Sequence, residues 1–228
     1  PHVRQLMGDT GTSTLGDFMP LPSRIVFMGT PDFALASLDA LLAEGLRPST
    51  VFTHSDKPAG RGHALTPSPV KRRALEQYLE VRQPANLKYP EVIAELRALR
   101  PEVVVVAAYG KLLPPRVLEI PPLGCINVHA SLLPRYRGAS PIAHAIWAGD
   151  QEVGVSIMRM EAGLDTGPVY KSRSISAPQD TTTRTLTPVL ARLGADLLVE
   201  TLRGLRDGVL EPCRQDDDLA TLAPRLKT

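Results

Sequence analysis

Apolar and polar positions along the chain predict strands and helices in alternation. Short apolar, β-branched runs, which are typical of buried strands, lie at residues 24–28, 50–53, 102–108 and 124–129. Between these runs apolar residues recur at helical spacing, as Leu38, Leu41 and Leu42 do after the first run. This order predicts an α/β fold with a doubly wound, mostly parallel sheet and helices on both faces.

The remaining pattern completes one domain. Alternating positions at 153–160 and 168–176 predict two more strands, and helices are expected at 69–80 and 140–149. Two closing helical stretches are expected between residues 182 and 205, one of them started or interrupted by Pro188. We expect a flexible leader at 1–23, one catalytic domain at 24–207, and at 208–228 a C-terminal tail or the start of a linker.

Composition narrows the class of protein. The longest apolar run, Val103 to Ala108, is far shorter than the roughly 20 residues that cross a bilayer, which excludes a transmembrane protein. No membrane partner is expected. Lys and Arg number 26 against 24 Asp and Glu, which excludes a histone-like protein. Two cysteines and five histidines without metal-ligand spacing predict no disulfide framework and no metal site. A reducing compartment, the cytoplasm, and a monomer are expected.

In a doubly wound sheet, ligands bind beyond the carboxyl ends of the strands. This rule places the chemistry at Gly29-Thr30, at Tyr109-Gly110 and between Asn127 and Gly138. Gly29-Thr30-Pro31-Asp32 does not match the dinucleotide-binding glycine fingerprint, so a nicotinamide cofactor is poorly supported.

Asn127 and His129 are two residues apart at the end of a predicted strand and should project from the same face. Asp165 follows in a glycine-flanked turn. Asn can donate a hydrogen bond to a developing oxyanion, His can act as an acid or a base, and Asp can orient the imidazole. Spacing alone leaves a plainer interpretation open, in which His129 is a hydrogen-bonded core residue and Asp165 caps a turn.

The chain resembles the 10-formyltetrahydrofolate-dependent formyltransferase family, and within it the members that act on charged initiator tRNA. The resemblance covers residues 24 to the C-terminus and is carried by MGTPDFA at 28–34, DKPAGRGHALTPSPVK at 56–71, AAYGKLLP at 107–114, GCINVHASLLPRYRGASPI at 124–142 and GLDTGPV at 163–169. It implies a Rossmann-like formyltransferase fold. It also implies formyl transfer from 10-formyltetrahydrofolate to the α-amine of the methionine on initiator tRNA.

The resemblance assigns roles to particular residues. It implies that Asn127, His129 and Asp165 are catalytic. The implied folate contacts are Ser131, Leu132, Leu133, Pro134, Gly163 and Leu164. The loop after the second strand is implied to enter the tRNA acceptor end, with Lys57, Arg61, Lys71 and Arg72 as the tRNA-binding residues.

Local charge agrees with a tRNA-binding loop. Between His54 and Arg73, five basic residues face a single acidic residue, Asp56, and such a loop can neutralise phosphates. A solvated helix start is the plainer explanation of the same charges. Family members that act on tRNA also carry a C-terminal β-barrel domain, and residue 228 falls near the expected start of the linker to it. A formyltransferase for another amine, such as an amino-sugar nucleotide, and a non-catalytic folate-binding remnant are therefore kept as alternatives.

Overall fold

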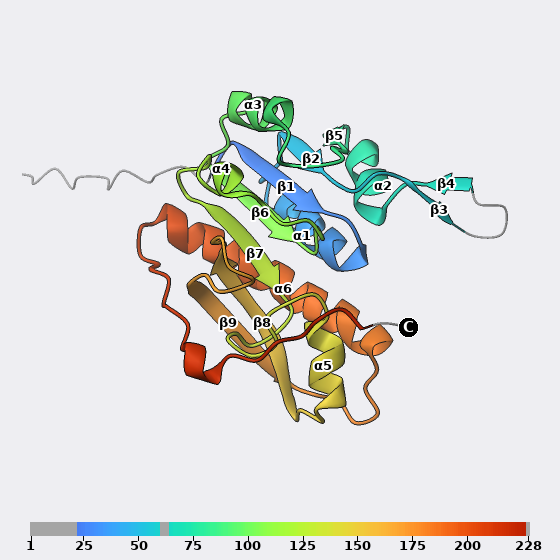
Figure 1. Cartoon of the computed structure of the whole chain (residues 1–228), viewed down its shortest axis with the longest axis vertical. Helices are drawn as coiled ribbons and strands as arrows, with labels where there is room; N and C mark the ends of the chain where they lie inside the picture. The colour runs from blue at the N-terminus through green and yellow to red at the C-terminus, as the bar shows by residue number, and fades with distance from the viewer. Residues whose placement is uncertain (1–21, 60–63, 227–228) are drawn as a thin grey trace, which may run out of the picture.

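The computed structural model describes residues 22–59 and 64–226, and its centre is a seven-stranded sheet in the order β5-β2-β1-β6-β7-β8-β9 (Figure 1). The strands of this sheet are β1 (Ile25–Gly29), β2 (Thr50–Phe52), β5 (Glu80–Arg82), β6 (Val103–Ala107), β7 (Cys125–His129), β8 (Glu152–Arg159) and β9 (Val169–Ser176). The helices are α1 (Asp32–Ala43), α2 (Pro69–Glu76), α3 (Pro90–Ala98), α4 (Pro115–Leu118), α5 (Pro141–Trp147) and α6 (Thr183–Arg206), followed by a 3₁₀ turn at Asp217–Leu219.

Strand directions confirm the predicted fold class. The pairs from β5 to β7 are parallel, whereas β7–β8 and β8–β9 are antiparallel. The chain leaves β1 toward β2 and β5, then returns to the other side of β1 with β6. The topological switch point therefore lies between β1 and β6, where Gly29 pairs with Ala107.

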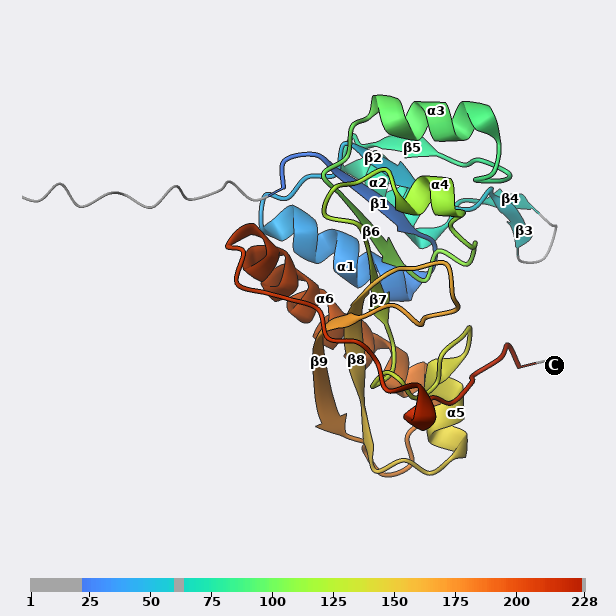
Figure 2. The same cartoon turned by 60° about the vertical axis from the view of Figure 1, so that its left-hand side comes forward.

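Two apolar layers enclose the sheet, and the valine run of β6 contributes to both. Val103 and Val105 pack with α1, α2, α5 and α6, whereas Val104 and Val106 face α3 and α4. Figure 2 shows α1 and α6 lying against each other on one side, with α3 and α4 on the other. Because alternate side chains of a strand point to opposite faces, a strand buried on both faces needs an apolar residue at every position.

The prediction of two closing helical stretches was wrong. Residues 183–206 form one 24-residue helix with Pro188 inside it. Leu186, Leu190 and Leu198 belong to a stripe of buried residues along its whole length. Burial of that stripe outweighs the roughly 3 kcal/mol that an interior proline costs a helix. Pro188 is also near the start, where Thr182 and Thr185 form a capping box.

The long loop predicted after β2 contains a hairpin. β3 (Lys57–Ala59) and β4 (Ala64–Thr66) pair antiparallel and project from the body of the protein (Figure 1). We call residues 57–59 and 64–66 the basic hairpin. These two strands and β5 are three residues long and, unlike β2, carry no run of β-branched or aromatic apolar residues, so the sequence predicted none of them.

The ends of the chain were predicted as a leader and a tail. Residues 1–21 lie outside the described part, and the amide of Ser23 donates to Glu102 Oε2 at 2.7 Å. Residues 208–226 run back across the domain toward α5 (Figure 2). On the way, the backbone of Cys213 pairs with that of Val169 at the start of β9, and the backbone of Leu222 then pairs with that of Arg137.

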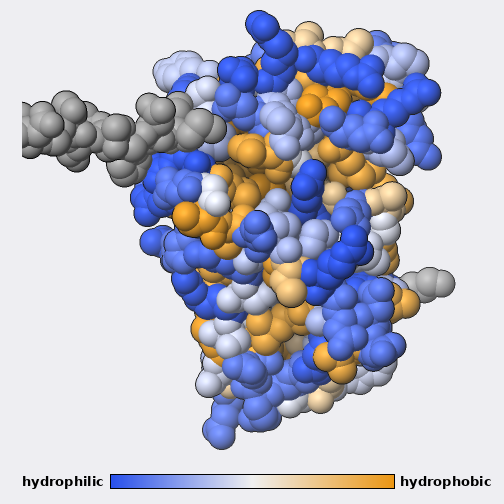
Figure 3. All heavy atoms as spheres, turned by 90° about the vertical axis from the view of Figure 1, so that its left-hand side faces the viewer, coloured by the Kyte–Doolittle hydropathy of each residue, from blue (hydrophilic) through white to orange (hydrophobic). Residues whose placement is uncertain are grey.

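Among the described residues, no helix is both long and apolar enough to cross a membrane. On the face shown in Figure 3, apolar surface is divided into small areas by hydrophilic side chains. That face therefore presents no single extended apolar surface to a partner.

Candidate active site

A cavity of about 570 Å³ opens beyond the carboxyl ends of β6 and β7. Its walls come from the ends of these strands and the chain after each, from the turn that follows β8, from the first turns of α1, α5 and α6, and from Arg225. Tyr109, Gly110 and the segment starting at Asn127 line it, as the switch-point rule predicts, whereas Gly29 and Thr30 do not. The Thr30 hydroxyl instead accepts from the His54 amide at 3.3 Å, which ties two loops together.

Asn127 and His129 project from the same face of β7, as predicted, and both line this cavity. They are 9% and 5% exposed, so the cavity gives them their access to solvent. In the part of the chain that the structure describes, the Asn127 amide shows no hydrogen-bond partner. Cys125 lies on the same face, and burial raises the pKa of its thiol to about 12, so Cys125 stays protonated and is a poor nucleophile.

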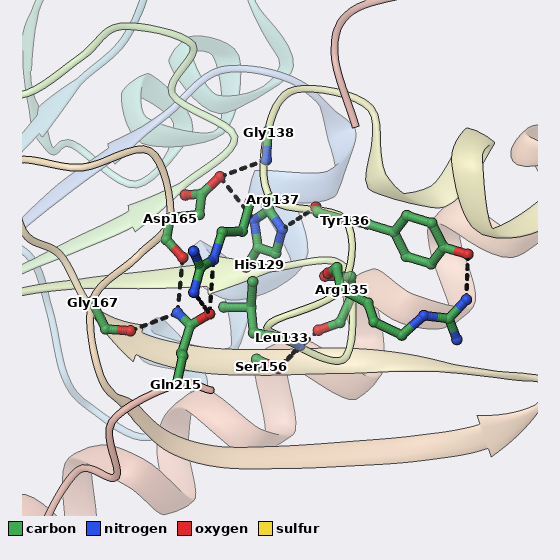
Figure 4. Close-up of polar contacts among 11 residues, drawn as sticks. His129, Leu133, Arg135, Tyr136, Arg137, Gly138, Ser156, Asp165, Gly167 and Gln215 are labelled. Carbon is green, nitrogen blue, oxygen red and sulfur yellow. Dashed lines mark hydrogen bonds and ion pairs between the residues drawn. The ribbon is translucent and has the colours of Figure 1, made fainter. Parts of the chain in front are cut away.

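The imidazole of His129 lies between two groups (Figure 4). Its Nε2 is 2.9 Å from the backbone oxygen of Tyr136. A carbonyl oxygen only accepts hydrogen bonds, so Nε2 must carry the proton of that bond. Nδ1 lies 3.7 Å from Oδ2 of Asp165, within ion-pair range but longer than a hydrogen bond. Nδ1 is therefore the ring nitrogen left available to a reacting atom.

Asp165 reaches the site from the turn between β8 and β9. Its backbone is in the left-handed region, with φ of 51°. Its Oδ2 accepts from the Gly138 amide at 2.9 Å, which aims the carboxylate at His129. Gly167 closes the turn against β8, because a Cβ there would lie 1.8 Å from the Arg159 carbonyl oxygen. The structure thus brings the three predicted catalytic residues to one wall of the cavity.

The six residues predicted to contact folate do not all line the cavity. Leu164 lines the cavity, whereas the other five do not. The Ser131 hydroxyl donates to the Arg135 carbonyl at 2.6 Å, and the Leu133 amide donates to Ser156 Oγ at 3.0 Å. Leu132 packs against Gly154. In this structure Ser131, Leu132, Leu133 and Pro134 build the loop that carries Tyr136, and Gly163 lies in the Asp165 turn.

The segment after β6 forms a wall of the cavity, although none of its residues was assigned a catalytic or binding role from the sequence. Ala108, Tyr109, Gly110, Lys111 and Leu112 all line the cavity. The Tyr109 hydroxyl is buried without a hydrogen-bond partner among the described residues, and burial raises the pKa of Tyr109 to about 12. The signal was present in the sequence, because this segment directly follows the most apolar predicted strand.

The predicted tRNA-binding residues have different surroundings. Lys71 Nζ donates to Asp56 Oδ2 at 2.7 Å and to Gln83 Oε1 at 2.9 Å, so Lys71 braces the base of the basic hairpin. Lys57 and Arg72 are exposed and extend toward solvent. Arg61 lies outside the described residues. No cluster of metal-ligating side chains is found within the described ranges.

Comparison with known sequences places this geometry in a family. The pattern of the formyl transferase family matches residues 23–202. Methionyl-tRNA formyltransferase from Methylococcus capsulatus is 52% identical over 204 residues, and the enzyme of that name from Halorhodospira halophila is 50% identical over 206 residues. Each alignment covers 90% of this chain and 66% of the relative, so the chain spans just under two thirds of their length.

Solved structures give the same fold. Phosphoribosylglycinamide formyltransferase from Bacillus halodurans superposes with a TM-score of 0.67 at 25% identity, over 80% of this chain and 94% of that one. An N-formyltransferase from Helicobacter canadensis, solved with folinic acid and dTDP-3-aminofucose, superposes with a TM-score of 0.65 at 17% identity. This superposition covers 89% of this chain and 71% of the Helicobacter chain. At 17% identity the likeness concerns the fold alone.

Proposed function

The chain belongs to the formyl transferase family, and on that premise we propose that it transfers a formyl group from 10-formyltetrahydrofolate to the α-amine of methionine on charged initiator tRNA. Two relatives about half identical to the chain bear the name methionyl-tRNA formyltransferase. One observation carries the proposal. Asn127, His129 and Asp165 meet on the wall of a cavity beyond the carboxyl ends of β6 and β7.

In the proposed reaction the amine attacks the formyl carbon directly. A free α-amine titrates at about 7.7–8.0, so a substantial share of it is neutral and nucleophilic near neutral pH. Attack forms a C–N bond and places negative charge on the formyl oxygen. The Asn127 amide, which lines the cavity, donates to that oxygen. The step needs no covalent enzyme intermediate.

His129 and Asp165 manage the proton in this scheme. Nε2 stays bonded to the Tyr136 carbonyl, so Nδ1 is the nitrogen that meets the reacting atoms. Protonated at Nδ1, His129 supplies a second donor to the oxyanion, and the Asp165 carboxylate lies 3.7 Å from that nitrogen. Asp165 then helps to pass the proton from the attacking nitrogen to the N10 leaving nitrogen. Collapse breaks the formyl–N10 bond and releases tetrahydrofolate.

The two substrates are assigned to two regions. The folate donor is assigned to the cavity, where Leu164, Leu112 and Met160 offer apolar surface to a ring system. The tRNA acceptor end is assigned to the basic hairpin, with the loop that joins its strands, and to the exposed side of α2. Lys57 on the hairpin and Arg72 on α2 are exposed and free of ion pairs with described residues. Unstacked RNA ends are accessible to such a projecting hairpin.

The direct test measures formyl incorporation into charged initiator tRNA by the purified chain, with 10-formyltetrahydrofolate as donor. A His129→Ala variant is the matched control. Formylation that disappears in the control supports the proposal. Folate binding without formylation of tRNA overturns the proposed acceptor, and amino-sugar nucleotides are then the next amines to test. Absence of both folate binding and formylation overturns the proposed function as a whole.

A further inference from the structure

One segment far along the chain contacts both loops that hold the His129 imidazole. We call residues 213–223 the strap. It begins where Cys213 pairs with Val169 at the start of β9, and it ends where Ala223 packs against Gly138. The sequence gives this stretch no apolar period, and nothing in the proposed mechanism uses it.

On the Nδ1 side of the imidazole, Gln215 holds the Asp165 turn. Its Nε2 donates to the Asp165 carbonyl at 2.8 Å and to the Gly167 carbonyl at 2.7 Å. Its Oε1 accepts from Nε and Nη2 of Arg137 at 3.0 and 2.9 Å. Figure 4 shows Gln215 between the arginine and the two carbonyls. Gln215 thus connects the turn to the loop that follows β7.

Arg137 is suited to act as the fixed point of this connection. Its side chain is 8% exposed, and Nη2 also pairs with Asp217 at 2.7 Å. A buried guanidinium without acceptors is strongly unfavourable, so it confines Gln215 to the orientation in which Oε1 faces the arginine. The amide nitrogen of Gln215 is then forced to face the two carbonyls of the Asp165 turn.

On the Nε2 side, the strap holds Tyr136. The Tyr136 amide donates to Thr221 Oγ1 at 2.8 Å, and the Arg137 amide donates to the Thr221 carbonyl at 2.8 Å. The Ala223 amide donates back to the Arg137 carbonyl at 2.7 Å. The carbonyl that receives Nε2–H is therefore carried by a backbone that the strap clamps at several points.

Backbone geometry explains why both loops need this support. Tyr136 and Asp165 have φ of 61° and 51°, in the left-handed region that side chains other than glycine rarely adopt. Such conformations persist where surrounding contacts fix them. The strap supplies those contacts to both residues, and these are the residues that flank the two ring nitrogens of His129.

We propose that Gln215 and Arg137 are positioning residues, which fix the Asp165 carboxylate beside Nδ1 of His129 through the Asp165 turn. The inference rests on the proposed function for its effect on turnover. Its structural content, the placement of Asp165, can be measured without any reaction.

The decisive variant is Gln215→Glu in the full chain. Glutamate keeps an acceptor for Arg137 but loses the two donated bonds and sets a carboxylate against two carbonyl oxygens. We expect kcat to fall about 10- to 100-fold, the range that a displaced catalytic group produces, with both KM values unchanged. Gln151→Glu is the matched control, because exposed Gln151 donates to the Gly149 carbonyl at 3.2 Å, outside the cavity. It should keep wild-type kcat.

Nitrogen-15 spectra of the His129 imidazole give the independent readout. In Gln215→Glu the Nδ1 resonance should shift, because its carboxylate neighbour moves, whereas the Nε2 resonance should remain. A folded Gln215→Glu protein with wild-type kcat and an unshifted Nδ1 overturns the inference, and so does a fall in kcat with Nδ1 unshifted. If wild type formylates no acceptor, the proposed function fails, and the Nδ1 shift alone decides the positioning role.

A second variant covers the case in which Gln215→Glu does not fold. Arg137→Lys keeps a cation near Asp217 but cannot make the two bonds to Gln215 Oε1. It should give the same Nδ1 shift and a smaller loss of kcat. Because the two residues act through one connection, the double variant should lose no more than the larger single loss, whereas multiplied losses would contradict the shared connection.

Discussion

The active-site wall and the basic hairpin lie on the same protein but are built in opposite ways. His129 is 5% exposed and is held through residues that are distant in sequence, such as Gln215, which is 50 residues from Asp165. Lys57 is exposed, and the hairpin that carries it pairs two neighbouring three-residue strands. A catalytic group must be placed accurately, whereas a phosphate-binding arm needs mainly charge and reach. Substitutions in the two regions should therefore change different kinetic constants.

The largest effect is expected at Asn127. Asn127→Ala should fold normally and lose about 10²–10³-fold in kcat, because a donor to the oxyanion is removed. Both KM values should stay close to wild type, since Asn127 acts on charge that develops during the reaction. Steady-state kinetics with each substrate varied in turn would check this, and an unchanged kcat would refute the role of Asn127.

A second loss of turnover is expected when a methyl group is added at Gly167, in the turn that carries Asp165. Gly167→Ala puts a Cβ against the Arg159 carbonyl, so the Asp165 turn must shift, and kcat should fall about 10²-fold. Gly45→Ala is the matched control, because Gly45 has φ of +72° and open space around it. The control should lose roughly 1–2 kcal/mol of stability and keep its kcat. Equal kcat in the two variants would contradict the importance of the turn.

The hairpin should respond in KM rather than in kcat. The double variant Lys57→Ala with Arg72→Ala removes one exposed charge from the hairpin and one from α2, which follows it. It should raise KM for tRNA and reduce the magnitude of the slope of log K against log salt by about two. Arg192→Ala provides a control that removes one positive charge elsewhere, because Arg192 lies on α6 and pairs with Asp196 at 3.3 Å. If the control changes the salt dependence by as much per charge removed, the charge is acting through the whole molecule, and Lys57 and Arg72 are not the contacts.

The smallest effect is expected at the junction of the two regions, where His54 meets Tyr109 with ring centroids 5.6 Å apart. Burial lowers the pKa of His54 below 6.5, and the charges of Lys111 and Lys57 lower it further. The unfolded chain then binds more protons, so stability should fall as pH drops below about 6.5. His54→Phe should flatten that dependence in thermal unfolding between pH 5.5 and 7.5. If the stability of the variant depended on pH in the same way as that of the wild type, the lowered pKa of His54 would be contradicted.

Particular residues show how far sequence alone reaches. The valine run of β6 predicted a central strand correctly, because burial on both faces leaves an unambiguous pattern. Asn127, His129 and Asp165 could be named because their side-chain chemistry and spacing are visible in the sequence. The Tyr136 carbonyl and the Gln215 amide could not, since one acts through its backbone and the other through contacts 50 and 78 residues away. Pro188 misled the helix prediction because local propensity says nothing of the sheet that α6 covers.

The two outer strands of the sheet carry charged side chains that bear on whether another chain can add to the sheet. An outer strand offers unpaired backbone groups to which another chain can add, and inserted charge is a common defence against such addition. β9 carries Lys171 and Arg173, which pair with Glu200 at 3.7 and 2.8 Å, and β5 carries Glu80 and Arg82, which pair with each other. Extending the sheet at either side would require these charged groups to be desolvated or moved. The edges thus resist aggregation, although the sheet remains open.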